Sequence, residues 1–285
     1  SDYPSTKEHG NRERTYYTED IYVGYRYFET FAPEQVQIPF GFGLSYTEFL
    51  MEGESCIVRE NCIEVSATVQ NKGHHYAGKE VVQVYLEAPQ GRLGRPARQL
   101  VGFAKTGLLS PGERQTVCVH IPLERLATYD DSGVTGHKSC YVLEAGEYKL
   151  HVGSSIRCTR EIPVQNGHKE HQGGLVIENL QILHQLQEAV APEEAFQRIK
   201  PGHRKDDGRY GIHYEPVPLS TVDLAERIEK NLPEELPITG DKGIKFQEVR
   251  SGKATIEQFV AQLQLSDLAA IVRGVGMGST KVTPG

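Results

Sequence analysis

The sequence predicts a mainly β protein, with one β-sandwich over residues 51–166, an irregular segment before it and a helical extension after it. Three observations predict this fold class. Apolar and polar residues alternate with a period of two in several short segments, which is typical of half-buried strands. Sequences rich in Gly, Pro, Asn and Ser separate these segments as turns. Capped segments with helical apolar spacing gather in residues 216–285.

The N-terminal residues 1–50 are rich in Tyr, Phe, Gly and Pro and show little periodicity. They are predicted to form an extended segment, packed through its aromatic side chains, rather than a helix.

Four strands can be placed within residues 51–166 from their alternating apolar positions. About seven short strands over ~110 residues are typical of a β-sandwich of the immunoglobulin or fibronectin type III kind. The apolar face of each of the four strands is formed by Ile63, Val65, Ala67 and Val69; by Val82, Val84 and Leu86; by Val117, Val119 and Ile121; and by Tyr148, Leu150 and Val152.

Residues 167–215 are predicted to be a linker with a short helix, because Leu180, Leu183 and Leu186 have helical spacing. The polar stretch His203–Tyr214 is predicted to continue the linker or to pack as a loop on a neighbour.

Residues 216–285 are predicted to be helical. Ser220 or Thr221 can cap a first helix, and Thr255 with Gln258 forms a capping-box pattern for a second. Ser266 can cap a last helix that ends at Gly274.

Length and composition exclude several classes of protein. The 285 residues suffice for about two domains. Asp and Glu (38) outnumber Lys and Arg (31), so the formal charge is −7, which argues against nucleic-acid binding. No apolar run approaches the ~18 residues of a membrane-spanning helix. Because the chain begins with Ser and ends on a turn signal, we expect a piece of a longer chain.

The five cysteines are Cys56, Cys62, Cys118, Cys140 and Cys158. An odd number without CxxC spacing argues against a disulfide framework and a zinc ribbon. We therefore expect a reducing compartment and a cytoplasmic location. A core disulfide of the immunoglobulin type is the alternative.

Patterns for metal or phosphate binding are weak. Gly274–Gly278 is glycine-rich, but it follows a predicted helix, whereas a phosphate loop follows a strand. His168 and His171 are three residues apart without a third ligand nearby, and His74-His75 follows a turn. Solvated loops are favoured at each place, so no metal or cofactor site is predicted.

Adjacent carboxylates occur at five places, but they do not predict a catalytic pair. Glycoside hydrolysis needs two carboxyl groups that face each other across about 5–10 Å, whereas sequence neighbours point in different directions. No Gly-x-Ser-x-Gly nucleophile elbow is present either. No catalytic residue is therefore predicted in this chain. The five pairs are Glu19/Asp20, Asp130/Asp131, Glu193/Glu194, Asp206/Asp207 and Glu234/Glu235.

Two motifs, Tyr17–Phe28 (YTEDIYVGYRYF) and Ile38–Phe49 (IPFGFGLSYTEF), resemble a signature of family 3 glycoside hydrolases. In that family the signature ends an α/β sandwich domain and leads into a fibronectin type III-like domain. Arg26 is expected to pair with a carboxylate such as Glu19, because an unpaired buried guanidinium would be costly. The stretches that fit the second domain are Val69–Gly73 (VQNKG), Gly78–Leu86 (GKEVVQVYL), Arg98–Phe103 (RQLVGF) and Leu109–Glu113 (LSPGE).

Leu236–Gly243 and Ser266–Met277 resemble the lead-in to a (β/α)8 barrel in members that place the barrel last. The resemblance implies that residues 1–50 end the α/β sandwich domain and that 51–166 form the fibronectin type III-like domain. Residues 167–215 would then be the linker, and 216–285 a helical lead-in to the barrel.

The resemblance implies that the parent is a retaining β-glycosidase, and specifically a β-glucosidase that hydrolyses terminal β-D-glucosyl residues. An Asp on the barrel would be the nucleophile and a Glu on the α/β sandwich domain the acid/base, through a covalent intermediate. Neither motif lies in this chain. The chain is therefore expected to be an inactive bracing part that packs on the other two domains. A β-glucoside or oligosaccharide would be the parent's substrate.

Two alternatives remain open at this point. The parent could be a β-xylosidase or another β-glycosidase. The chain could also be a stand-alone carbohydrate-binding or adhesion module. The absence of Trp counts against that module, because sugar-binding surfaces commonly stack sugars on exposed aromatic side chains.

Overall fold

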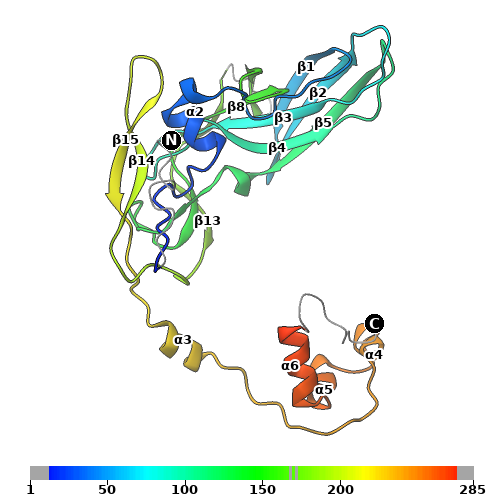
Figure 1. The fold of residues 1–285 in the computed structure, drawn as a ribbon, viewed down its shortest axis with the longest axis vertical. Helices are drawn as coiled ribbons and strands as arrows, with labels where there is room; N and C mark the ends of the chain where they lie inside the picture. The colour runs from blue at the N-terminus through cyan, green and yellow to red at the C-terminus, as the bar shows by residue number, and fades with distance from the viewer. Residues whose placement is uncertain (1–12, 167–168, 171–172, 275–285) are drawn as a thin grey trace. The chain divides into compact units, whose positions relative to one another are not determined.

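The computed structural model describes residues 13–166, 169–170 and 173–274. The chain divides into two compact units, Ser1–Val222 and Asp223–Gly285. Most of the regular structure of the first unit is β-strand, and that of the second is helical (Figure 1). The predicted mainly β fold with a helical C-terminal extension is thus confirmed.

The first sheet of the sandwich has the order β11-β10-β1-β2-β5. Its long antiparallel strands are β1 (Phe49–Val58), β2 (Cys62–Asn71) and β5 (Arg114–Pro122). The two-residue strands β10 (Gln165–Asn166) and β11 (Lys169–Glu170) extend it beside β1. The predicted alternation is confirmed, because the apolar residues of β2 are buried at every second position and β5 repeats the pattern. The 3-10 turn η2 (Leu123–Leu126) follows β5.

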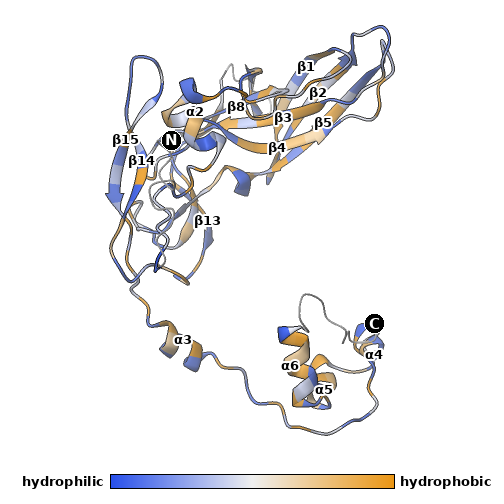
Figure 2. Cartoon of the chain, in the orientation of Figure 1, coloured by the Kyte–Doolittle hydropathy of each residue, from blue (hydrophilic) through white to orange (hydrophobic). Residues whose placement is uncertain are grey.

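The second sheet has the order β12-β8-β3-β4, with β9 also paired to β8. Hydrophobic residues follow the strands of both sheets (Figure 2). They meet in one core between the sheets, to which Ile121, Leu143 and Leu150 contribute fully buried side chains. The strands are β3 (Val81–Glu87), β4 (Gln99–Lys105), β8 (Gly146–Gly153), β9 (Thr159–Ile162) and β12 (Leu175–Ile177).

Strand β3 is buried on both faces, which differs from the half-buried strand predicted. Gln83 and Tyr85, on the face away from the core, are buried as well. The N-terminal segment covers this face: the Tyr25 ring lies 6.4 Å from the Tyr85 ring, and its hydroxyl accepts a hydrogen bond from the Leu100 N–H (2.9 Å). The Tyr85 hydroxyl donates to Gln83 Oε1 (2.5 Å), so the buried polar groups satisfy each other.

The prediction that residues 1–50 contain no helix is wrong. Helix α2 (Tyr25–Phe31) and the 3-10 turn η1 (Pro33–Gln35) lie in this segment. Tyr27 and Phe31, one turn apart, form a small buried cluster with Tyr22 and Ile199. Packing against residues far away in the sequence stabilises this short helix, and a periodicity search over its own seven residues cannot show that.

The predicted short helix around Leu180–Leu186 is also wrong. The segment forms strand β13 (Gln181–Gln185), in which Ile182 pairs with Val142 of β7 (Cys140–Leu143), and β6 (Thr128–Asp130) completes a three-stranded sheet. Short apolar runs fit a strand or a helix equally well, and here the pairing with β7 decides.

Residues 197–216 form a hairpin rather than the predicted polar linker. Its strands are β14 (Gln197–Arg204) and β15 (Tyr210–Pro216), and Figure 2 shows a largely hydrophilic outer end. The domain boundaries at residues 50, 166 and 215 remain predictions.

The second unit contains α3 (Leu224–Lys230), α4 (Phe246–Arg250), α5 (Ile256–Ala261) and α6 (Leu265–Arg273). The capping box of Thr255 and Gln258 is confirmed, as is Gly274 at the end of the last helix. The first helix is capped by Asp223 rather than by Ser220 or Thr221, and the last begins before Ser266. Among the described residues no helix is long and apolar enough to cross a membrane.

Candidate functional site

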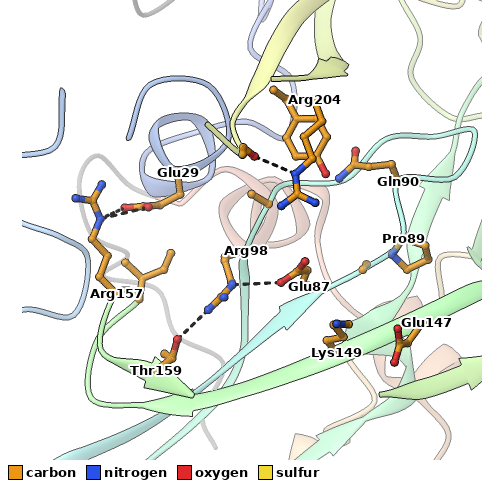
Figure 3. A pocket seen from close by; sticks show the side chains of 15 residues that line it. Glu29, Glu87, Pro89, Gln90, Arg98, Glu147, Lys149, Arg157, Thr159 and Arg204 are labelled. Carbon is orange, nitrogen blue, oxygen red and sulfur yellow. Dashed lines mark hydrogen bonds and ion pairs between the residues drawn. The ribbon is translucent and has the colours of Figure 1, made fainter. Parts of the chain in front are cut away.

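A pocket of about 540 Å³ opens on the first unit. Helix α2, the end of β3, strands β8 and β9 and the outer end of the β14–β15 hairpin surround it (Figure 3). Its carboxylates are Glu29, Glu87 and Glu147. Its cationic side chains are Arg98, Lys149, Arg157 and Arg204.

An ion pair between Glu29 and Arg157 forms one wall. Arg157 Nε donates to both Glu29 oxygens (3.0 and 3.3 Å), and Arg157 Nη2 donates to the Pro33 carbonyl (2.7 Å). Glu29 belongs to α2 and Arg157 to the turn between β8 and β9. This wall therefore attaches the N-terminal segment to the sandwich.

The floor is built around Glu87. His151 is buried, and its Nε2 lies 3.1 Å from Glu87 Oε2. This hydrogen bond lowers the pKa of Glu87 despite the opposing effect of burial, so Glu87 is an anion at neutral pH. Arg98 Nε lies 3.8 Å from the same oxygen, and its Nη1 donates to Thr159 Oγ1 (2.8 Å). Burial lowers the pKa of Arg98.

Arg204 reaches the pocket from the end of β14. Its Nε donates to the Gly208 carbonyl (3.1 Å), and its guanidinium carbon lies 5.8 Å from the centre of the Tyr210 ring. Gly208 has φ 87°, a conformation that glycine adopts without strain and that closes this turn. Figure 3 shows the guanidinium directed into the pocket.

The pocket suits binding better than acid–base catalysis. A general acid needs a carboxyl group that stays protonated at the working pH, and Glu87 is held ionised. Glu29 is occupied by Arg157, and Glu147 Oε1 accepts a hydrogen bond from the Gly174 N–H (2.9 Å). The three carboxylates of the pocket therefore have structural roles, because each holds neighbouring groups in place.

Two of the five acidic pairs are brought together. Asp20 and Asp131 both contact Arg198 Nη1, at 3.3 and 2.6 Å, and Glu215 contacts Arg198 Nε at 2.9 Å. Burial raises the pKa of Asp20. Because a guanidinium lies among these carboxylates, the cluster is a structural link and not a catalytic pair. The sequence offers no signal for it, since its members come from different elements.

The other acids do not meet across a cleft. Asp130 is buried and accepts hydrogen bonds from three N–H groups of its own loop, those of Ser132, Gly133 and Thr135. Asp207 pairs with Arg209, and Glu194 with Arg14. Glu234 and Glu235 are exposed.

The ion pair expected between Arg26 and Glu19 is not formed among the residues that the structure describes. Glu19 is buried, and its Oε2 atom has no hydrogen-bond partner there. Its neighbour Asp20 reaches a cation instead, at Arg198.

No group of three or more His, Cys, Asp or Glu side chains within residues 13–166, 169–170 and 173–274 could hold a metal ion. His74 and His75 are exposed, and the His168/His171 pair and most of Gly274–Gly278 lie outside the described residues. The five cysteines are free thiols.

Another feature is an exposed apolar surface on the loop before β1. Leu44 and Tyr46 are 93% and 92% exposed, and Phe42 is also exposed, as is Tyr76 on the neighbouring loop between β2 and β3. The Tyr46 and Tyr76 rings lie 5.9 Å apart. Ile38 and Phe40, on the same loop, extend this surface, which we call the aromatic loop surface.

Comparison with known proteins explains the fold. Residues 80–156 match the model of the fibronectin type III-like domain. The whole chain is 45% identical to part of a β-glucosidase from Ruminococcus albus. The whole chain also superposes on a crystal structure of a β-glucosidase from Paenibacillus barengoltzii, with a TM-score of 0.86 and 53% identity. The chain is homologous along its entire length to family 3 β-glucosidases.

This family 3 homologue spans only part of its relatives: 28% of the Ruminococcus albus protein and 30% of the Paenibacillus barengoltzii chain. A GH3 β-glucosidase from Bifidobacterium adolescentis matches 56% of this chain and 23% of its own length, with 32% identity and a TM-score of 0.50. Relatives thus differ in how much of this chain they share. The resemblance found in the two N-terminal motifs is confirmed.

Proposed function

We propose that this chain is the non-catalytic bracing part of a retaining β-glucosidase that hydrolyses terminal β-D-glucosyl residues. The identity to β-glucosidases along the whole chain supports this, as does the large share of those relatives that lies outside the match. The nucleophilic Asp and the acid/base Glu would belong to that remaining part. Among the described residues, Glu29 and Asp131 are paired with arginines and Glu87 is held ionised, which agrees with this proposal.

The proposed order is the end of an α/β sandwich domain, the fibronectin type III-like domain, and the lead-in to a barrel. The motifs in residues 17–49 and 236–277 support this order. A cytoplasmic location is proposed from the five free cysteines.

The exposure of the aromatic loop surface is the observation that best supports a bracing role. Its loop is anchored, because the Phe40 ring stacks on Tyr25 (4.6 Å) and the Phe40 carbonyl accepts from the Ile156 N–H (3.0 Å). The same loop nevertheless presents Leu44 and Tyr46 to solvent. A fixed, exposed apolar surface is typical of an interface. We infer that it packs against another domain of the same enzyme.

Hydrolysis of an aryl β-glucoside tests the catalytic half of this proposal. The 285-residue chain should release no aryl alcohol above the rate in buffer, while the longer enzyme that contains it turns over. Saturable hydrolysis by the chain alone, in proportion to its concentration, would refute the proposal.

The bracing half is tested with Leu44→Asp in the longer enzyme. Because this change places a charge in the proposed interface, the enzyme should lose activity at a lower temperature. Val190→Asp is the matched control, since Val190 is 91% exposed and lies outside the aromatic loop surface. Equal thermal inactivation of both variants would contradict an interface at Leu44.

A further inference from the structure

The pocket in Figure 3 has an excess of positive charge in an acidic chain. It contains four cationic side chains and three carboxylates, whereas the whole chain has a formal charge of −7. Two of the carboxylates are committed to neighbouring side chains, Glu29 to Arg157 and Glu87 to His151. The third, Glu147, is held by a backbone N–H.

Three of the cations have either a long ion-pair contact or none. Arg98 has one long ion-pair contact, 3.8 Å from its Nε to Glu87 Oε2, and burial lowers the pKa of its guanidinium. Lys149 Nζ lies 3.5 Å from Glu161, which does not line the pocket. Among the described residues Arg204 forms no ion pair and donates only to a carbonyl.

The Arg204 guanidinium is held in place while part of it stays available. Its Nε donates to the Gly208 carbonyl and its guanidinium carbon lies 5.8 Å from the centre of the Tyr210 ring, so these two contacts orient it while its two terminal nitrogens face the pocket (Figure 3). A guanidinium fixed in this way matches the paired oxygens of a carboxylate or phosphate, which it binds with two parallel hydrogen bonds.

We propose that this pocket binds a small oxyanion, a carboxylate or a phosphate, through Arg204, Arg98 and Lys149. A neutral sugar is disfavoured, because the Tyr210 ring on which it could stack is covered by Arg204. A cation is disfavoured by the excess of positive side chains. The volume of about 540 Å³ accommodates a small organic acid or phosphate ester. This proposal does not depend on the proposed function.

Calorimetric titration of the 285-residue chain with sodium phosphate and with sodium succinate tests the proposal. Sodium chloride at matched ionic strength and glucose are titrated in parallel. At least one of the two oxyanions should bind with saturation. Arg204→Gln and Lys149→Gln should each weaken that binding by about tenfold or more, because each removes a charge-assisted hydrogen bond. Both side chains are at the surface, so the variants should fold.

Arg209→Gln is the matched control, since it removes the same charge from the same hairpin. Arg209 pairs with Asp207 (2.6 Å) and Glu34 (3.0 Å) and does not line the pocket. Its variant should bind the oxyanion as the parent chain does. Equal weakening by Arg209→Gln, binding of glucose in place of both oxyanions, or no saturable binding of either oxyanion at millimolar concentration would each overturn the proposal.

Discussion

Arg198 forms a two-pronged ion pair with Asp131: Nη1 lies 2.6 Å from Oδ2 and Nη2 lies 3.0 Å from Oδ1. Arg198 belongs to β14 and Asp131 follows β6, so this pair fixes the hairpin to the body of the first unit. Asp20 and Glu215 contact the same guanidinium and add the N-terminal segment and β15 to the link.

Arg198→Gln should therefore destabilise the first unit by about 2 kcal/mol. The cost is below the ~3–5 kcal/mol of a fully buried pair, because the three carboxylates are still 25–36% exposed. Urea unfolding followed by circular dichroism measures it. In contrast, Arg209→Gln, at a surface pair with Asp207, should leave the unfolding midpoint close to that of the parent chain, because solvent screens such a pair. Equal losses in both variants would show that the Arg198 link is unimportant.

The thermal stability of the chain should fall in acid, partly because Glu87 becomes protonated. The hydrogen bond from His151 holds the pKa of Glu87 below its ordinary value of 4.5 in the folded chain. The resulting stability is fully present above that value and is lost as the pH falls through the folded pKa. Melting temperatures measured from pH 7 to pH 3 should therefore show a gap between the parent chain and Glu87→Gln that closes at low pH. Glu60→Gln, at an exposed carboxylate, should have the same melting temperature as the parent chain at each pH. A difference between the parent chain and Glu87→Gln that does not change with pH would refute the coupling of stability to the Glu87 charge.

The core between the sheets can be tested with a matched pair of leucines. Leu150→Ala should cost about 3 kcal/mol, because Leu150 is fully buried and the change leaves a cavity. Leu44→Ala, at a leucine that is 93% exposed, should change the stability of the isolated chain by less than ~0.5 kcal/mol. Chemical denaturation measures both, and a small cost at Leu150 would contradict the assignment of the core.

Gly41 tests how the N-terminal segment covers β3. It has φ 86°, and a Cβ added to it would lie 2.6 Å from Gln83 Oε1. Gly112 has φ 82° and nothing within 4 Å of its added Cβ, so Gly112→Ala isolates the backbone cost of about 1–2 kcal/mol. Gly41→Ala should cost more than Gly112→Ala in thermal unfolding. Equal losses would mean that the loop does not press on Gln83.

Features of the fold that depend on residues close together in the sequence could be predicted from the sequence. Ile63, Val65, Ala67 and Val69 alternate with polar residues, and they are buried because they face the core between the sheets, while the residues between them are half-buried. Thr255 and Gln258 likewise mark the start of α5, since a capping box is a local interaction.

Long-range packing accounts for the features that the sequence does not predict. Tyr85 is buried because Tyr25, far earlier in the chain, covers it, and Ile182 lies in a strand because β7 is available for pairing. The pocket around Arg98 and Arg204 draws its charges from elements separated by many residues. These residues lie far apart in the sequence, so no spacing pattern predicts that they meet. They come together because strands, helix α2 and loops pack against one another in the folded unit.

The central claim is that the catalytic groups lie outside this chain, and covalent trapping tests it most directly. A 2-deoxy-2-fluoro-β-glucoside with a dinitrophenolate leaving group still transfers its sugar to the nucleophile of a retaining enzyme and releases the phenolate, but the fluorine slows hydrolysis of the covalent intermediate, so the nucleophile keeps the sugar. The 285-residue chain should show an unchanged intact mass after incubation, and peptide mapping of the longer enzyme should find the sugar on an Asp outside these residues. A stoichiometric adduct on any carboxylate of this chain would contradict the account.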